Sequence, residues 1–232
     1  MRRSDDFAAP GVLYAIVCGS SVARDVGTLV DLAQRDGWDV CVIATPDGNK
    51  FIDPATLRRQ TGHPVRISYK NPGDDDVLPP PDAIIVAPAT VNTVNKWAAG
   101  IADTLALGLL VEGLGLHLPI VVVPYTNSAM AAHPALHESM VRLASWGVDI
   151  LFGPTVVPLH PPGTGDLHRD RFPWRLALDR LNRRWVQDAP VDPDPSSGRG
   201  RTSDPGRPRG RDLASEGDGS VGRDLATEPD PA

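Results

Sequence analysis

The sequence predicts an α/β fold, a Rossmann-like doubly wound parallel sheet, on three observations. Short apolar runs alternate with amphipathic stretches over much of the chain. The runs are continuous rather than alternating apolar and polar, which is typical of strands buried on both faces. Small or polar residues follow them directly, where parallel strands end and ligands bind. With right-handed crossovers, these features predict a sheet covered by helices on both sides.

The first half of this predicted domain contains three strands and one clear helix. Residues 13–19, LYAIVCG, are a short apolar run that ends at Gly, which indicates a buried strand. Residues 25–37 carry apolar side chains at helical spacing and stop at Gly37, which predicts a helix. Residues 39–45, DVCVIAT, predict a second buried strand, and residues 64–69, PVRISY, predict a third.

The second half repeats the alternation. Residues 82–88, DAIIVAP, predict a fourth strand, and residues 93–113 predict a long helix. Residues 119–125, PIVVVPY, predict a fifth strand, followed by a helix over residues 133–147. Residues 148–154, VDILFGP, predict a last short strand, so strands and helices alternate to this point.

The amino-acid composition of the chain argues against two classes of binding partner. The chain has 232 residues, of which 41% are hydrophobic, enough for one sizeable core. Its formal net charge of -6 offers no basic surplus for a phosphate backbone, so nucleic acid is not expected as a partner. No apolar stretch approaches the roughly 20 residues that span a bilayer. We therefore expect no membrane partner.

Cysteine usage and the N-terminus bear on location. Cys18 and Cys41 both lie in apolar runs, which predicts buried, reduced thiols. Their spacing gives neither a disulfide framework nor a metal site, and we predict no metal. The opening residues are too polar for a signal peptide. We expect a cytoplasmic protein.

The composition changes near Pro190. From there to Ala232 the chain has no aromatic residue and is rich in Pro, Gly, Ser, Asp and Arg. It also contains an imperfect repeat, GRDLASE and GRDLATE, for which a docking role remains an alternative. Such a composition predicts disorder. We predict a flexible N-terminus over residues 1–10, one domain over 11–188, and a disordered low-complexity tail over 189–232.

Four loops after the predicted strands contain the candidate ligand-binding residues. Gly19, Ser20 and Ser21 form a possible phosphate cradle, although an ordinary Ser helix cap explains the same residues and neither a GxGxxG nor a P-loop motif is present. Thr45 follows the second strand. Thr90, Asn92 and Thr93 follow the fourth strand, and Asn127 follows the fifth. Loops of this kind meet at one edge of a parallel sheet, so they predict a ligand site.

The loop and helix over residues 87–105, APATVNTVNKWAAGIADTL, resemble the PASANT region of the homo-oligomeric flavin-containing cysteine decarboxylases. That family includes phosphopantothenoylcysteine decarboxylase and the lantibiotic peptidyl-cysteine decarboxylases. Val91 stands in place of the second small residue, and the matching positions are Pro88, Ala89, Thr90, Asn92, Thr93, Lys96, Gly100 and Asp103. PYTNSAMA is similar to the family's PxMNxxMW motif through Pro124, Asn127 and Met130.

The resemblance implies a flavodoxin-like fold, FMN as cofactor, and a homo-oligomer that is a trimer or a multiple of three. The implied cofactor-binding residues are Gly19, Ser20, Ser21, Thr45, Thr90, Val91, Asn92, Thr93 and Thr126. The phosphate is expected near the first four, and the ribityl chain and ring system along Thr90 to Thr93. In the family the two motif asparagines meet the substrate carboxylate, which makes Asn92 and Asn127 the candidate catalytic residues.

The sequence departs from the pattern of the cysteine decarboxylases at two catalytic positions. The family's catalytic His falls on Asp74, and the Cys of its C-terminal flap has no counterpart after Cys41. The flap region carries His160 and His168, which we expect on the surface of a mobile loop. The resemblance therefore implies an FMN-binding oxidoreductase for an unidentified small molecule or peptide, with decarboxylase chemistry lost.

Three alternatives remain open. One is a flavin-binding protein without turnover or a partner subunit of a decarboxylase. Another is a cysteine decarboxylase with a replaced base. The third, a flavin prenyltransferase, lacks support because the sequence shows no matching cluster of basic and aromatic residues.

Overall fold

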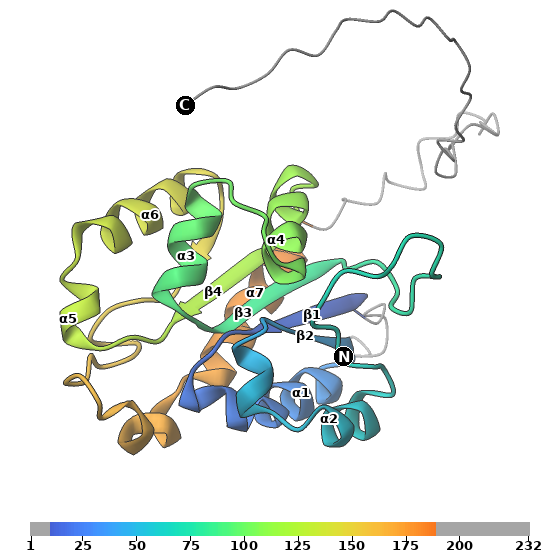
Figure 1. Cartoon of the computed structure of the whole chain (residues 1–232), viewed down its shortest axis with the longest axis horizontal. Coiled ribbons are helices and arrows are strands. Elements are labelled where there is room, and N and C mark those ends of the chain that lie inside the picture. The colour runs from blue at the N-terminus through green and yellow to red at the C-terminus, as the bar shows by residue number, and fades with distance from the viewer. Residues whose placement is uncertain (1–9, 189–232) are drawn as a thin grey trace, which may run out of the picture. The chain divides into compact units, whose positions relative to one another are not determined.

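The computed structural model describes residues 10–188 of the chain. Within them, five parallel strands form one sheet in the order β2-β1-β3-β4-β5 (Figure 1). This order is that of a doubly wound sheet, so the predicted fold class is confirmed. The predicted tail over residues 189–232 lies outside the described residues, as does all but the last residue of the predicted flexible N-terminus.

Four of the strands coincide with the apolar runs, and β5 is short. The strands are β1 (Val12–Val17), β2 (Asp39–Ala44), β3 (Ala83–Ala89), β4 (Ile120–Pro124) and β5 (Asp149–Ile150). β1 is an interior strand, with Ala15 pairing with Val42 of β2 on one side and with Ile85 of β3 on the other. β3 and β4 are buried along their whole length, as continuous apolar strands require.

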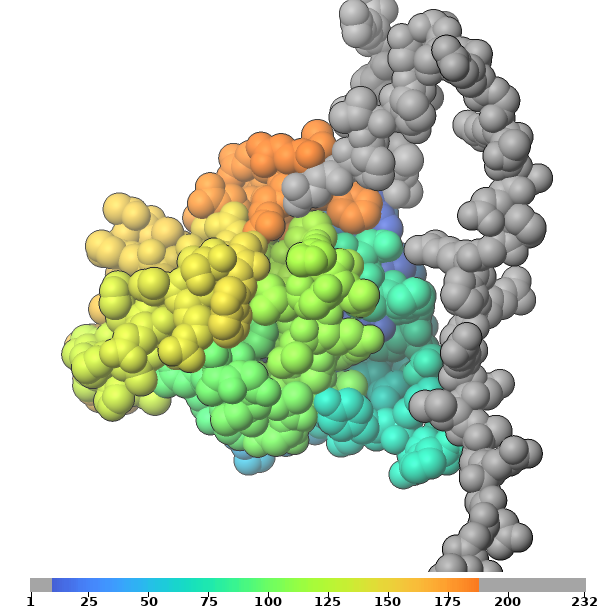
Figure 2. Space-filling model, turned by 90° about the horizontal axis from the view of Figure 1, so that it is seen from above, coloured from blue at the N-terminus to red at the C-terminus, as the bar shows by residue number. Residues whose placement is uncertain are grey.

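Helices cover both faces of the sheet. One face packs against α1 (Val26–Arg35), α2 (Pro54–Thr61) and α7 (Trp174–Asp188). The other packs against α3 (Val91–Ala98), α4 (Leu105–Gly115) and α6 (Pro134–Ser145), and Figure 2 looks onto these three helices, in green to yellow. Within residues 10–188 there are also four short helices: η1 (Ser21–Asp25), η2 (Gly48–Phe51), α5 (Ser128–Ala131) and η3 (Gly165–Arg171).

The side chains of β1 alternate between the two cores. Leu13 and Val17 enter the core with α1 and α7, whereas Tyr14 and Ile16 enter the core with α3, α4 and α6. Each fully buried Leu or Ile contributes about 1.5–3 kcal/mol to folding. Cys18 and Cys41 are buried and free, as the sequence predicts.

The prediction of a third strand over residues 64–69 is wrong. Only Arg66 pairs with the sheet, through an isolated bridge to Ile43 at the outer edge of β2. Its amide donates to the Val42 carbonyl at 3.1 Å, and its carbonyl accepts from the Ala44 amide at 2.8 Å. Pro64 has no amide hydrogen to extend this pairing, so the segment stays irregular.

The prediction of one long helix over residues 93–113 is also wrong, because α3 ends at Ala98 and α4 begins at Leu105. Gly100 has a φ of 73°, a left-handed conformation that glycine adopts without strain and that ends helices. Thr104 then starts α4, since its side chain accepts from the Leu107 amide. Residues 99–104 therefore separate α3 from α4.

Helix α7 is absent from the predicted elements. Its apolar residues Trp174, Ala177, Leu178 and Leu181 recur at helical spacing and are buried against the sheet. Five arginines and aspartates among residues 174–184 weaken the apolar signal of this segment. Among the helices of residues 10–188, none is long and apolar enough to cross a membrane.

Candidate functional site

A pocket of about 670 Å³ opens at the carboxyl ends of the strands. It is lined by the loops that follow β1, β2, β3 and β4. The chain leaves β1 toward one edge of the sheet and leaves β3 toward the other. Loops that diverge in this way leave a crevice at the point where the strand order reverses. The topology therefore explains why the pocket lies here.

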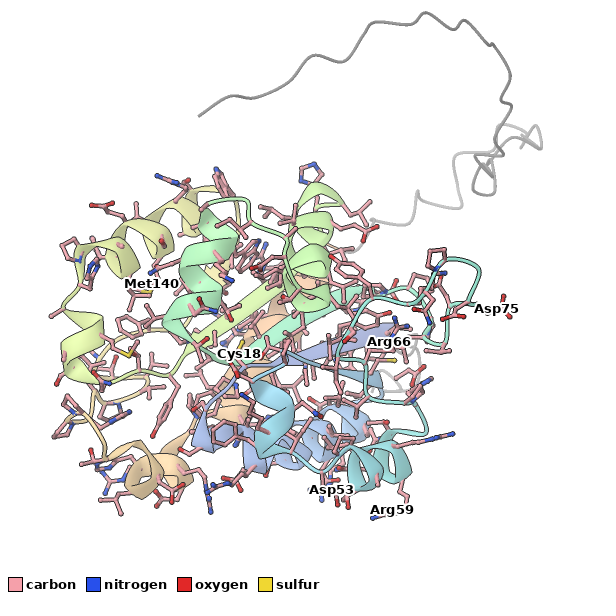
Figure 3. All side chains as sticks on the ribbon, viewed as in Figure 1. Cys18, Asp53, Arg59, Arg66, Asp75 and Met140 are labelled. Atoms are coloured by element: carbon pink, nitrogen blue, oxygen red, sulfur yellow. The ribbon has the colours of Figure 1, made fainter. Side chains whose placement is uncertain are left out.

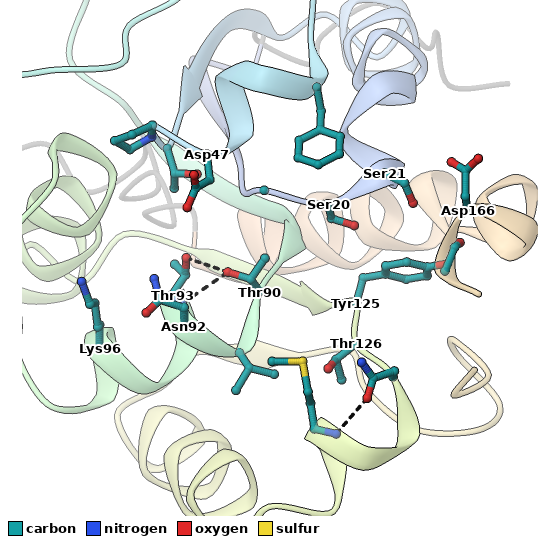
Figure 4. A pocket seen from close by; sticks show the side chains of 18 of the residues that line it. Ser20, Ser21, Asp47, Thr90, Asn92, Thr93, Lys96, Tyr125, Thr126 and Asp166 are labelled. Carbon is teal, nitrogen blue, oxygen red and sulfur yellow. Dashed lines mark hydrogen bonds between the residues drawn. The ribbon is translucent and has the colours of Figure 1, made fainter. Parts of the chain in front are cut away.

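The pocket brings together all the residues that the sequence predicts for cofactor binding. Gly19, Ser20, Ser21, Thr45, Thr90, Val91, Asn92, Thr93 and Thr126 line it, and so does Asn127. Figure 4 shows Ser20 and Ser21 on one side of the pocket and Thr90, Asn92 and Thr93 on the opposite side. Residues from four separate loops thus meet in one cavity.

The loop after β3 is held by its own threonines. The hydroxyl oxygens of Thr90 and Thr93 lie 3.1 Å apart, and the Thr93 amide donates to Thr90 Oγ1 at 3.4 Å, which caps α3. Beneath them lies Cys18, and burial raises the pKa of its thiol although hydrogen bonds with Thr93 and Thr90 oppose the shift. Asn92 remains exposed toward the pocket, and its side chain has no partner among residues 10–188.

The loops after β1 and β2 present hydroxyl groups. Those of Ser20 and Ser21 have no hydrogen-bond partner within the described part of the chain. Thr45 is buried, and its Oγ1 accepts from the Gly48 amide at 3.0 Å, which fixes the start of η2. The Thr45 amide donates to the Val17 carbonyl at 2.9 Å and so ties this loop to β1. The two serines are left available for a ligand.

The loop after β4 contributes two further polar groups. Thr126 is buried, and its Oγ1 has no partner among residues 10–188. A buried hydroxyl in that state costs about 1–3 kcal/mol. The neighbouring Asn127 caps α5, because its Oδ1 accepts from the Met130 amide at 2.9 Å. Its side-chain NH2 group, which only donates, is then the part of Asn127 that can meet a ligand.

The charged side chains that line the pocket are engaged in ion pairs. Asp47 pairs with Lys50 at 2.6 Å, and Lys96 pairs with Asp103 at 2.5 Å. Asp166 lies 3.1 Å from Arg24, which links η3 to η1. The walls therefore offer hydroxyl and amide groups in place of unpaired charges.

The segment after β5 closes one side of the pocket, a contribution that the sequence did not predict. His160, Gly163 and Gly165 line the cavity. The Tyr125 hydroxyl donates to the Gly165 carbonyl, and burial, reinforced by Asp166, raises the pKa of Tyr125. No local pattern joins residues 160–166 to the β4 loop, so only their proximity in the fold reveals the contact.

The expectation of a surface position is wrong for His160. Its side chain is buried, with a relative exposure of 7%. The ring packs against Tyr125 with centroids 5.1 Å apart, and the centroid of the His168 ring lies 6.1 Å away. His168 is half-buried and does not line the pocket. The two histidines of the flap region therefore differ in their environment.

Asp74, the position to which the resemblance assigns the decarboxylases' catalytic His, lies outside this pocket. It is exposed on a loop, where the Asn71 amide donates to its Oδ2 at 3.0 Å. Figure 3 shows the adjacent Asp75 at the outer end of that loop, far from Cys18, which follows β1. Within one copy of the chain, Asp74 therefore supplies no group to the pocket.

The sequence of this chain is similar to a known protein family and to curated proteins. The family model described as Flavoprotein matches residues 8–168. The coenzyme A biosynthesis bifunctional protein CoaBC of Thermococcus kodakarensis is 29% identical over 151 residues, which cover 62% of this chain and 35% of that protein. The chain thus spans about a third of the length of this curated relative.

Two solved structures share the fold. The FMN-dependent cysteine decarboxylase SpaF is 25% identical, with a TM-score of 0.55 over 62% of this chain and 84% of that one. The epidermin biosynthesis protein EpiD from Staphylococcus aureus is 28% identical, with a TM-score of 0.50 over 60% of this chain and 80% of that one. Because the family model covers more than half of the sequence, the chain belongs to the Flavoprotein family.

Proposed function

We propose that this chain binds FMN in the pocket and oxidises a thiol carried by a small molecule or a peptide. The observation that carries the proposal is the convergence of four strand-end loops on one cavity of about 670 Å³. That volume falls within the roughly 300–1,000 Å³ of typical cofactor and ligand sites. A thiol substrate is supported by SpaF, which is described as an FMN-dependent cysteine decarboxylase.

The residues of the pocket fit a flavin. The buried Thr126 hydroxyl has no partner within residues 10–188, and a polar ring edge would supply one. The Ser20 and Ser21 hydroxyls are also unpartnered in the described structure. Hydroxyl and amide donors of this kind bind phosphate and flavin oxygens without an added cation. The donor set therefore suits a phosphorylated, hydrogen-bonding cofactor.

Within this proposal each loop has a role. Ser20, Ser21 and Thr45 hold the phosphate, while residues 90–93 and Thr126 line the ribityl chain and the ring. Thr90 and Thr93 fix the shape of that loop through their mutual hydrogen bond. When bound, FMN supplies the two-electron oxidation, and the protein supplies binding and orientation.

Asn92 and Asn127 bind the substrate in this proposal. Among residues 10–188 the amide of Asn92 has no partner, and the NH2 group of Asn127 has none either, while its oxygen caps α5. Both can donate to a carbonyl or carboxylate of the substrate. The oxygen of Asn92 can also accept a hydrogen bond. Asn92 and Asn127 can therefore bind a polar group of the substrate whether or not that group is charged.

Decarboxylation is not part of the proposed reaction. Asp74 lies outside the pocket, and the sequence has no cysteine after Cys41. A second candidate, a cysteine decarboxylase with a replaced base, is favoured by one observation: a histidine, His160, lines the cavity. The similarity to SpaF supports the same candidate.

The test has two stages. FMN is first titrated into the purified protein and its binding followed by flavin fluorescence. The loaded protein is then incubated without oxygen with N-acetylcysteamine, a peptide ending in cysteine, and phosphopantothenoylcysteine. We expect N-acetylcysteamine to bleach the flavin absorbance and both cysteine compounds to keep their carboxylates by mass spectrometry.

The other outcomes separate the alternatives. A product lighter by CO2 and two hydrogens from either cysteine compound favours the second candidate. Bound FMN that no thiol bleaches favours a flavin-binding protein or partner subunit without turnover. Failure to bind FMN refutes the proposal as a whole.

We also propose a homo-oligomer, a trimer or a multiple of three, as the resemblance implies. Large apolar side chains are exposed on and beside α4 and α6, at Val111, Leu116, Val141 and Trp146. A second copy of the chain would remove such surface from water. Light scattering coupled to gel filtration measures the mass, and a monomer at micromolar concentration would contradict this assembly.

A further inference from the structure

The main chain sets His160 beside one of the two candidate substrate-binding asparagines. His160 and Asn127 form an isolated parallel bridge, and the Ser128 amide donates to the His160 carbonyl at 2.9 Å. The histidine is therefore held by the backbone next to the end of β4. Packing against the Tyr125 ring then leaves the imidazole little freedom to turn.

A hydrogen bond defines which ring nitrogen carries the hydrogen. Nδ1 of His160 lies 2.9 Å from the carbonyl oxygen of Pro161. A carbonyl oxygen only accepts, so Nδ1 is the donor in this pair. In a neutral imidazole the other nitrogen, Nε2, is then an acceptor with a free lone pair.

That acceptor has no partner. Nε2 of His160 is buried, and no hydrogen-bond donor reaches it among residues 10–188. Buried polar atoms are nearly always paired, and a catalytic role is one of the recognised reasons for an unpaired one. The Thr126 hydroxyl, one residue before Asn127, is unpaired in the same way. Two unsatisfied buried groups therefore lie at the same end of the pocket.

Gly165 leaves room for this ring edge. A Cβ placed on Gly165 would lie 3.0 Å from Cε1 and 3.1 Å from Nε2 of His160. Both residues line the pocket. The glycine therefore keeps a side chain from crowding the one nitrogen that lacks a partner.

We propose that His160 is the catalytic proton acceptor of this site, and that it takes the proton of the substrate thiol. The inference rests on the proposed function. In this step the S–H bond breaks and an N–H bond forms at Nε2, so a neutral thiol and imidazole become a thiolate and an imidazolium. The Nδ1–H···O bond to Pro161 holds the ring and its carbonyl dipole stabilises the positive charge.

The direct test observes the imidazole itself. The full chain is labelled with ¹⁵N-histidine and loaded with FMN, and the His160 resonances are assigned from their loss in His160→Gln. N-acetylpenicillamine is the probe, because the carbon bearing its thiol has no hydrogen and cannot be oxidised to a thiocarbonyl. We expect it to move the Nε2 resonance toward that of a protonated nitrogen. N-acetylvaline, which lacks the thiol, should leave it unchanged.

Kinetics provide the second readout. His160→Gln places an amide near the Nε2 position, and His160→Asn keeps a donor for Pro161. Both should bind FMN as the wild type does, and both should bleach it with N-acetylcysteamine about 100- to 10,000-fold more slowly, the usual contribution of a general base. His168→Gln, whose ring lies outside the pocket, should stay within about threefold of wild type by the same measure.

The outcomes distinguish this inference from the proposed function. If FMN fails to bind, the proposed function itself is refuted. If FMN binds and thiols bleach it, but Nε2 does not respond to N-acetylpenicillamine or both His160 variants keep the wild-type rate, the assignment of His160 alone is overturned. An equal response to N-acetylvaline would overturn it as well.

Discussion

The hydroxyl oxygens of Thr90 and Thr93 lie 3.1 Å apart, at the point where β3 gives way to α3. Thr90 is the cap of the helix, and Thr93 is buried against Cys18. The Thr90 hydroxyl therefore caps a helix, by accepting from the Thr93 amide, and also shapes the wall of the pocket. Stability and ligand binding should be coupled at this position.

Replacing Thr90 by Ala tests that coupling. The variant loses the cap of α3, so its free energy of unfolding should fall by about 1 kcal/mol in urea denaturation. Because the same hydroxyl orders the loop, FMN content after purification should fall too. The control Asp53→Ala removes the cap of α2, which lies outside the pocket. It should lower stability while FMN content stays at the wild-type level, and an equal loss of FMN in both variants would contradict the coupling.

Thr126→Val should lower FMN affinity without lowering the stability of the protein. The substitution removes a buried hydroxyl that has no partner within the described chain, so the stability of the flavin-free protein should be unchanged or higher. FMN affinity should fall about fivefold, the equivalent of one hydrogen bond of about 1 kcal/mol.

Thr126→Ser is the matched control for that variant. It keeps the hydroxyl and loses a buried methyl group, so FMN affinity should be retained while stability drops by about 0.8 kcal/mol. Urea denaturation and fluorescence titration give the two quantities. Equal FMN affinity in the Val and Ser variants would show that the hydroxyl does not meet the cofactor.

Asn92→Asp should weaken FMN binding or abolish turnover. A carboxylate at this exposed position of the pocket wall would repel the electron-rich edge of the ring or an anionic substrate. Fluorescence titration and flavin bleaching by N-acetylcysteamine measure the two effects. Asn71→Asp makes the same chemical change on a loop outside the pocket and should alter neither. Wild-type binding and bleaching in Asn92→Asp would show that the site is misassigned.

The buried thiol of Cys41 predicts a loss of stability at alkaline pH. Burial, reinforced by Asp39, raises its pKa from the ordinary value of 9.0 to about 12. A raised pKa in the folded state gives stability that is complete below pH 9 and declines as pH rises toward 12. At pH 10 the loss from this thiol should be about 1.4 kcal/mol.

Cys41→Ala checks the sign of that effect. Urea denaturation at pH 8 and pH 10 gives the pH-dependent loss of stability for wild type and variant. The variant should lose about 1.3 kcal/mol less over this interval, whatever its stability at pH 8. Cys18, whose pKa burial also raises, still contributes in both proteins. Identical losses would mean that Cys41 ionises as readily in the folded protein as in the unfolded chain.

The sequence by itself determined four of the five strands and the residues at their ends. Continuous apolar runs identify β1 through β4, because a strand buried on both faces has few polar positions. The polar residues after those runs then identify Ser20, Thr45, Asn92 and Asn127, because parallel strands end at the same edge. These inferences need only local composition and the rules of parallel sheets.

Tertiary structure alone decided the rest. The break at Gly100 depends on a left-handed backbone conformation that apolar spacing does not reveal. The burial of His160 depends on its bridge to Asn127, 33 positions earlier in the sequence, and on packing against Tyr125. Asp74, the position to which the resemblance assigns the decarboxylases' His, lies on an exposed loop outside the pocket. Contacts between segments far apart in the chain depend on how the helices pack on the sheet, and local sequence patterns carry no direct record of that packing.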